Sequence, residues 1–218
     1  MKTVPVILGL LLAGAFCGMQ VFADTHTLSS NESLIREVEQ LRTSLAMRDH
    51  ARPSLTLRLA DLLFDHANDL GKLAPDSTQR SGLDKTRARA VALYLEALSG
   101  TLGSVPAGSL KLKIQFQLAR LYSDLQSPQA IVLWKLLYQQ QDLIDLRREA
   151  ALRIAEHYEQ TATKQAEDFY HKAIELCPQG DACYYPHYRL AWLYHRAAKH
   201  EAALEELKLS LFDSKEQV

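Results

Sequence analysis

The chain has 218 residues, of which 47% are hydrophobic and 23% charged, a composition typical of globular proteins and sufficient for one domain or a short repeat array. Lys and Arg total 25 and Asp and Glu total 26, so there is no basic excess of the kind that indicates nucleic-acid binding. Only 9 glycines and 7 prolines occur among many Ala and Leu. This composition favours helix over sheet, because straight-chain residues lose little rotamer freedom in a helix.

The first 23 residues have the composition of a secretory signal peptide. Lys2 is the only charged residue before Asp24, an apolar run follows it, and the segment ends in small residues up to Ala23. We therefore predict cleavage after Ala23 and export, with the periplasm as the expected compartment. The run is too short for a membrane-spanning helix, which needs about 20 apolar residues. Secretion and lipid attachment at Cys17 are the alternatives, although Phe16 before the cysteine fits a lipid-attachment motif poorly.

A helix is predicted from Ser29 to Met47, within an N-terminal segment of residues 24–50. Ser29 and Glu32 have the spacing of a capping box. Apolar residues then recur at spacings of four, three and four, at Leu34, Val38, Leu41 and Leu45. Such a seam predicts either a helix that caps the following repeats or a short coiled coil through residues 28–50, by which the chain would self-associate.

The next segment, residues 51–100, predicts a helix pair of degenerate sequence. Leu59-Ala60 begins the apolar pattern of its first helix, and Ala90, Tyr94 and Ala97 mark the second. Between them, residues 71–84 contain Gly, Pro, Asp and Ser, which predicts an inserted loop. Asp84 is then expected to cap a helix that begins at Lys85.

Three further helix pairs are predicted from an internal repeat. The pattern large-Ala-x-x-Tyr begins at Leu118, Ile154 and Leu190, at a constant pitch of 36 residues. After each copy, three residues at spacings of four and three share one helix face: Ala130, Trp134 and Leu137; Ala166, Tyr170 and Ala173; and Ala203, Leu207 and Ser210. The predicted pairs cover residues 109–142, 145–178 and 183–212, and a polar tail of residues 213–218 follows.

The turns between these helices carry their own signals. Ser127-Pro128 predicts an N-cap followed by proline at the first helical position. Neither helix of a pair can bury its apolar stripe alone, so the pairs must stack on one another.

This pattern resembles the tetratricopeptide repeat (TPR), and the predicted signal peptide indicates an exported bacterial member. The copy from Ile154 to Pro178 matches best, and the resemblance covers about residues 53–212. It implies an all-α, right-handed solenoid of antiparallel helix pairs, preceded by the capping helix. One departure is that the glycine usual between the two helices of a repeat is missing.

By the same resemblance, the first helix of each pair lines a concave groove that binds other proteins. Among the residues at the groove positions, seven are the candidates for binding: Phe116, Arg120, Glu156, Tyr185, Tyr188, Trp192 and Arg196. Tyr, Trp and Arg are frequent anchors of protein interfaces. The alternative is that these side chains pack against a neighbouring repeat.

The expected function is a non-catalytic scaffold or assembly adaptor that holds proteins of the cell envelope. Two alternatives stay open: an oligomeric spacer assembled through the N-terminal helix, and the N-terminal part of a larger TPR protein. The chain has no Gly-rich phosphate loop, nucleophile elbow or dinucleotide fingerprint, so we expect no enzyme activity, cofactor or small-molecule substrate.

The remaining polar residues are assigned structural roles. Cys177 and Cys183 flank the connection between two pairs, and in an oxidising compartment a disulfide is the expected state. The histidines lack the spacing of a helical zinc site, so no metal is predicted. Glu149, Glu156 and Glu159 recur at helical spacing, which predicts a solvated face.

Overall fold

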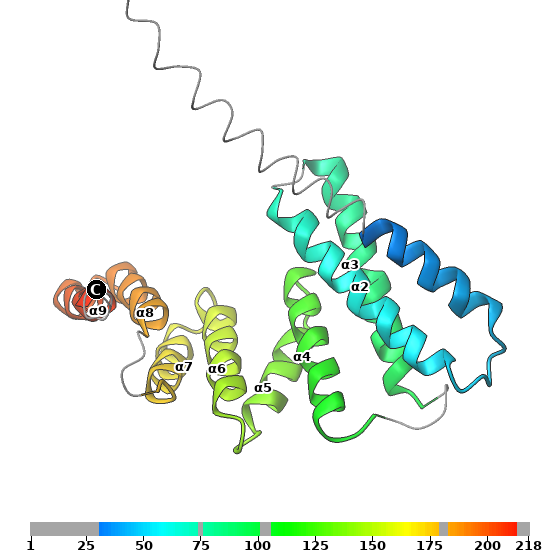
Figure 1. The fold of residues 1–218 in the computed structure, drawn as a ribbon. Coiled ribbons are helices and arrows are strands. Elements are labelled where there is room, and N and C mark those ends of the chain that lie inside the picture. Colours follow the sequence, from blue (N-terminus) through cyan, green and yellow to red (C-terminus); the bar gives the residue numbers. More distant parts are fainter. Residues whose placement is uncertain (1–30, 74–75, 101–105, 179–182, 213–218) are drawn as a thin grey trace, which may run out of the picture. The chain divides into compact units, whose positions relative to one another are not determined.

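The structure is a computed structural model that describes residues 31–73, 76–100, 106–178 and 183–212. Every regular element within these ranges is a helix (Figure 1), which confirms the predicted all-α repeat architecture. The predicted signal peptide and the polar tail lie outside the described residues. Among the helices that are described, none is long and apolar enough to cross a membrane. The chain divides into two compact units, Met1–Pro106 and Ala107–Val218.

The first unit contains a helix over residues 31–44, α2 (Arg52–Lys72) and α3 (Ser77–Leu98). The faces on which α2 and α3 pack together carry small and aromatic residues. Ala60 of α2 and Ala90 and Tyr94 of α3 have no exposed surface. The Tyr94 hydroxyl donates a hydrogen bond to Asp61 Oδ1 at 2.6 Å. Burial and the neighbouring carboxylate of Asp61 raise the pKa of Tyr94 above its usual value. The Tyr94 hydroxyl therefore keeps its proton and remains a hydrogen-bond donor.

The N-terminal helix makes polar contacts with both α2 and α3. Arg42 Nε donates to Thr56 Oγ1 at 2.8 Å, and Arg42 Nη2 lies 2.6 Å from Glu96 Oε2. The apolar residue buried on this helix is Ile35, which is not part of the predicted seam. Leu34 and Leu41 of the seam are exposed. Val38 and Leu45 of the seam are partly buried, so the seam lies along the edge of the face by which this helix packs on its own unit.

The predicted loop over residues 71–84 is wrong. Gly71 lies within α2, which continues to Lys72, and α3 begins at Ser77. Most of the segment is therefore helical. Asp76 caps α3 in place of Asp84: its carboxylate accepts from Gln79 N at 2.8 Å, and Gln79 Oε1 accepts from Asp76 N at 3.0 Å. This capping box satisfies two backbone donors and outweighs the helix-breaking effect of Gly82, which costs about 1 kcal/mol inside a helix.

Within its described residues, 107–178 and 183–212, the second unit contains six helices in three pairs. They are α4 (Gly108–Asp124), α5 (Gln129–Tyr138), α6 (Ile144–Tyr158), α7 (Thr163–Glu175), α8 (Tyr184–Arg196) and α9 (His200–Phe212). Each of these helices packs against the next one in sequence, so the pairs stack as the repeat pattern predicted (Figure 1). The alanines of the large-Ala signature, Ala119, Ala155 and Ala191, are all buried at these packing surfaces.

The connection from α4 to α5 differs slightly from the prediction. Pro128 is the N-cap of α5 and Gln129 its first residue, one position later than expected. Ser127 does not cap the helix backbone; its hydroxyl bonds instead to the Gln129 side chain. Differences of one residue at a helix end are within the normal fraying of helix termini.

Two turns between paired helices use a left-handed residue that is not glycine. Gln126 has φ 53° and Ala198 has φ 58°. The turn after α8 is closed by hydrogen bonds from Lys199 N to Tyr194 O at 3.0 Å and from Ala198 N to His195 O at 3.0 Å. Gln126 and Ala198 thus stand where the repeat pattern usually has glycine. Both are strained, because a residue with a Cβ pays about 1–2 kcal/mol to adopt a left-handed conformation.

We therefore expect Ala198→Gly to raise the free energy of unfolding by about 1 kcal/mol, since glycine adopts positive φ without the clash of a Cβ. Urea denaturation followed by circular dichroism measures the change. Ala197→Gly is the matched control: Ala197 has φ −84°, so there the substitution is expected to destabilise by about 0.5–1 kcal/mol. A loss of stability in both variants would contradict the assignment.

A disulfide joins Cys177, just after α7, to Cys183, the N-cap of α8, with their Cα atoms 6.3 Å apart. On the chain-entropy argument, closing so short a loop stabilises the fold by about 2 kcal/mol. We expect Cys177→Ser plus Cys183→Ser to lose this amount in urea denaturation. A reducing agent should lower the stability of the wild type by the same amount and leave the double variant unchanged. A wild type insensitive to reduction would contradict this contribution.

Candidate protein-binding surface

The first helices of two neighbouring pairs in the second unit, α6 and α8, are joined through their side chains. The Tyr185 hydroxyl of α8 donates to Glu156 Oε1 of α6 at 2.9 Å. Arg189 of α8 binds the carboxylate of Glu159, which lies just after α6. Arg189 Nε donates to Glu159 Oε1 at 2.9 Å, and Arg189 Nη2 donates to Glu159 Oε2 at 2.6 Å. Side chains 29 and 30 positions apart in sequence therefore come together on neighbouring repeats.

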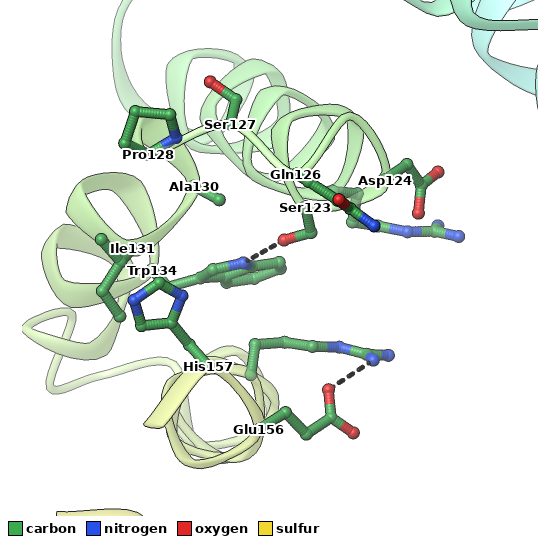
Figure 2. A pocket seen from close by; sticks show the side chains of 12 residues that line it. Ser123, Asp124, Gln126, Ser127, Pro128, Ala130, Ile131, Trp134, Glu156 and His157 are labelled. Carbon is green, nitrogen blue, oxygen red and sulfur yellow. Dashed lines mark hydrogen bonds and ion pairs between the residues drawn. The ribbon is translucent and has the colours of Figure 1, made fainter. Parts of the chain in front are cut away.

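A crevice of about 570 Å³ opens between α4, α5 and α6 (Figure 2). We call it the inter-helix crevice; its lining includes Arg120, Ser123, Asp124, Trp134, Arg153 and Glu156. Figure 2 shows the indole of Trp134 between the side chains of α4 and those of α6. Its Nε1 donates to Ser123 Oγ at 2.9 Å. The crevice thus has an aromatic base and a polar, charged rim.

Both signs of charge line this rim. Arg153 Nε lies 2.8 Å from Glu149 Oε1, and Arg153 Nη1 lies 3.0 Å from Glu156 Oε2. Burial acts to lower the pKa of Arg153, but the two carboxylates outweigh it and hold the pKa above its usual value. Arg153 therefore stays charged and neutralises the acidic side of the crevice. The chemistry suits a polar peptide surface better than a strongly charged ligand.

The predicted groove residues Glu156 and Tyr185 act as a pair. Glu156 accepts from both Arg153 and Tyr185, so its carboxylate is already satisfied within the fold. Burial and the Glu156 carboxylate raise the pKa of Tyr185, which keeps the hydroxyl a donor. The ring of Tyr185 stays partly exposed, so this pair offers an aromatic face held in a fixed position.

Tyr188 and Trp192 are exposed aromatic residues of the predicted groove. Their ring centroids lie 6.4 Å apart in an edge-to-face arrangement, and His195 continues the series 5.7 Å beyond Trp192. They border a second crevice of about 410 Å³, which also involves α9. We call it the terminal crevice; its lining is Tyr188, Ala191, Trp192, His195, His200, Ala203, Leu204 and Leu207.

The other predicted residues differ in their exposure. Phe116 is partly buried, because its ring packs edge-on against Trp134 with centroids 5.6 Å apart. Arg196 is half exposed and lies 3.4 Å from Glu159 Oε2. Arg120 lies in the inter-helix crevice and has interactions within the fold. Of the predicted groove residues, Arg120 and Glu156 thus line the inter-helix crevice and Tyr188 and Trp192 line the terminal crevice. The other three line neither, and Phe116 contributes to the core.

Glu159 is not on a solvated face, contrary to the prediction. Its side chain is only 9% exposed and accepts hydrogen bonds from Arg189 and from the hydroxyl of buried Tyr170. Burial and this carboxylate raise the pKa of Tyr170 above its usual value. Burial alone would lower the pKa of Arg189, but the hydrogen bonds to Glu159 and Tyr170 raise it. We call Glu159, Tyr170 and Arg189 the carboxylate cluster; it joins two repeats.

One signal in the sequence could have revealed this cluster. Ser123 and Glu159 occupy the same position of the repeat, five residues after the large residue of the signature. In each case the aromatic residue of the second helix, Trp134 or Tyr170, donates to that position. A polar residue there predicts a hydrogen bond inside the pair rather than a solvated side chain.

The histidines make ordinary contacts. His187 Nδ1 lies 2.7 Å from Glu206 Oε2, and His171 Nε2 lies 3.3 Å from the Tyr194 hydroxyl. Among the described residues, no three His, Cys, Asp or Glu side chains come together in a way that could hold a metal ion.

Comparison with known proteins finds a solved structure of similar fold but no matching family. No protein-family model matches the chain, and no curated protein matches it in sequence. Among solved structures, it is similar to the crystal structure of MamA, with a TM-score of 0.54 and 14% sequence identity. The match covers 88% of this chain and 94% of that chain. At this identity the likeness concerns the fold alone, and it supports a helical repeat of the TPR type.

Proposed function

We propose that the chain is a non-catalytic scaffold that binds other proteins along the first helices of its second unit. The observation that carries the proposal is the exposed aromatic series of α8, where Tyr188 and Trp192 stand edge to face and half exposed. Large aromatic side chains that remain exposed in rigid positions are efficient interface anchors, since little side-chain entropy is lost when they bind.

The geometry around these residues supports the same function. Tyr185 is held by Glu156, and the inter-helix crevice next to it has a polar rim over Trp134. A rim of satisfied polar groups around aromatic anchors is the usual anatomy of a protein interface. We place the scaffold in the cell envelope, with the periplasm as its compartment, because of the predicted signal peptide. A disulfide such as Cys177–Cys183 fits an oxidising compartment.

A pull-down from envelope extract tests the proposal. Tyr188→Ala plus Trp192→Ala, and separately Arg120→Ala plus Tyr185→Ala, are expected to weaken capture of the specific partner at least about 30-fold. This corresponds to the loss of one interface hot spot of about 2 kcal/mol.

The matched control is Val132→Ala plus Leu136→Ala, two exposed apolar residues of α5 that line neither crevice. Its partner list should equal that of the wild type. Identical lists for the wild type and both groove variants would reject the surface.

One observation favours a second candidate, an oligomeric spacer assembled through residues 28–50. Leu34 and Leu41 lie seven residues apart on the N-terminal helix, so they share a face, and both are exposed. Light scattering on the full chain and on Leu34→Lys plus Leu41→Lys distinguishes the two. A mass that falls to that of a monomer in the variant supports the spacer, and an unchanged mass removes it.

A further inference from the structure

The surface of α8 and α9 corresponds to surfaces that are covered elsewhere in the same unit. Leu207 occupies the repeat position of Trp134 in α5 and Tyr170 in α7. Trp134 is 1% and Tyr170 0% exposed, whereas Leu207 is 38% exposed. Leu204, at the position of partly buried Ile131, is 54% exposed.

In the other two pairs, the first helix of the next pair covers this surface. Trp134 belongs to one buried cluster with Ala150 and Ile154 of α6. Tyr170 belongs to another with Leu190 of α8. In both cases the covering helix buries two apolar residues four positions apart, Ala150 with Ile154 and Pro186 with Leu190. The occupants of this surface thus share one chemistry: an amphipathic helix with a small or compact residue at i and a large aliphatic residue at i+4.

One further difference between the terminal crevice and the covered surfaces bears on which helix fits it. Trp192 stands where Arg120 and Glu156 stand in the earlier first helices. Glu156 bonds to Tyr185, which lies five residues before the large aliphatic residue of the covering helix. An apolar Trp192 cannot accept such a bond, so a helix that covers it is best matched by an apolar residue at that place.

From these equivalences we infer that the terminal crevice binds an amphipathic helix of another polypeptide, laid across α8 and α9 as α6 is laid across α4 and α5. The inference goes beyond the groove function, because its contacts include α9 residues outside the groove. The helix carries compact and large aliphatic residues at i and i+4, with an apolar residue one position before i to cover Trp192. Its residues at i and i+4 pack on Leu204 and Leu207.

The test uses the natural occupant of the equivalent surface as its probe. A fluorescein-labelled peptide of residues 144–158, the α6 sequence, is titrated against the full chain by fluorescence anisotropy. Saturable binding is expected. Leu204→Glu and Leu207→Glu should each weaken it at least about tenfold, because a carboxylate would be buried against apolar residues.

Matched controls separate the crevice from general stickiness. Leu209→Glu alters a residue of α9 that is 51% exposed and outside the terminal crevice, so it should leave binding unchanged. A peptide with Ile154→Asp should bind at least about tenfold more weakly, since it loses the large aliphatic residue. A peptide with Glu149→Leu should bind more tightly than the unaltered one, because its apolar residue meets Trp192.

Several results would overturn the inference. They are the absence of saturable binding, equal weakening by Leu204→Glu and Leu209→Glu, and a dimer in light scattering that Leu204→Glu dissociates, which would assign the surface to a second copy. Arg120→Ala plus Tyr185→Ala should not affect peptide binding. The groove proposal and this inference can therefore fail independently.

Discussion

Trp134→Ala is expected to lower the free energy of unfolding of the second unit by about 3–5 kcal/mol. Trp134 is 1% exposed and is the largest buried side chain of its helix pair. Its ring packs against Phe116 and, in one buried cluster, against Ala150 and Ile154 of the next repeat. Truncation removes these contacts and leaves a cavity, and it also leaves the Ser123 hydroxyl without its indole donor.

The chain provides its own control, because it has only two tryptophans. Trp192 is 49% exposed, so Trp192→Ala should change stability by less than about 1 kcal/mol. Urea denaturation followed by circular dichroism at 222 nm measures both variants. Equal losses in the two would show that Trp134 does not occupy the core between the repeats.

Glu159→Ala is expected to lower the free energy of unfolding by about 2–4 kcal/mol. This is the second largest effect that we predict for a single substitution. The alanine leaves the buried Tyr170 hydroxyl without its acceptor and Arg189 without its ion pair. Breaking a buried pair costs about 3–5 kcal/mol, and we place the value lower because Arg189 is 33% exposed and water can solvate it. The carboxylate cluster therefore couples the pair α6–α7 to α8.

A double-mutant cycle with Tyr170→Phe isolates this coupling. In the Tyr170→Phe background, Glu159→Ala should cost at least about 0.5 kcal/mol less, since no tyrosine hydroxyl is left unsatisfied. Glu175→Ala, an exposed glutamate near the end of α7, should be neutral within about 0.5 kcal/mol. Additive losses from Glu159→Ala and Tyr170→Phe would contradict the cluster.

The helix pairs of the second unit were predictable from local sequence patterns, whereas the connection between α2 and α3 was not. The 36-residue signature at Leu118, Ile154 and Leu190 led to the correct helix pairs, because it records a helix period and a packing face that recur along the chain. The loop prediction over residues 71–84 failed, because isolated Gly and Ser residues weigh less than the capping box of Asp76 and Gln79.

The candidate site was predictable to a smaller extent. The groove positions could be read from the repeat, but their partners could not: Glu156 and Tyr185 are 29 residues apart in sequence, and Glu159 and Arg189 are 30 apart. Whether two side chains bond depends on donor and acceptor coming within about 3 Å, and helix period alone leaves that distance open.

Helical periodicity, the repeat pitch and the cysteine spacing are properties of neighbouring residues, so the amino-acid order was enough to predict an all-α repeat with a bridge between Cys177 and Cys183. The burial of Glu159 and the exposure of Leu204 and Leu207 depend on which helix lies over which. Leucines at helical spacing look the same in sequence whether or not another helix covers them. Only the packing of the described helices, which leaves Leu204 and Leu207 exposed, shows that this surface of α9 is open.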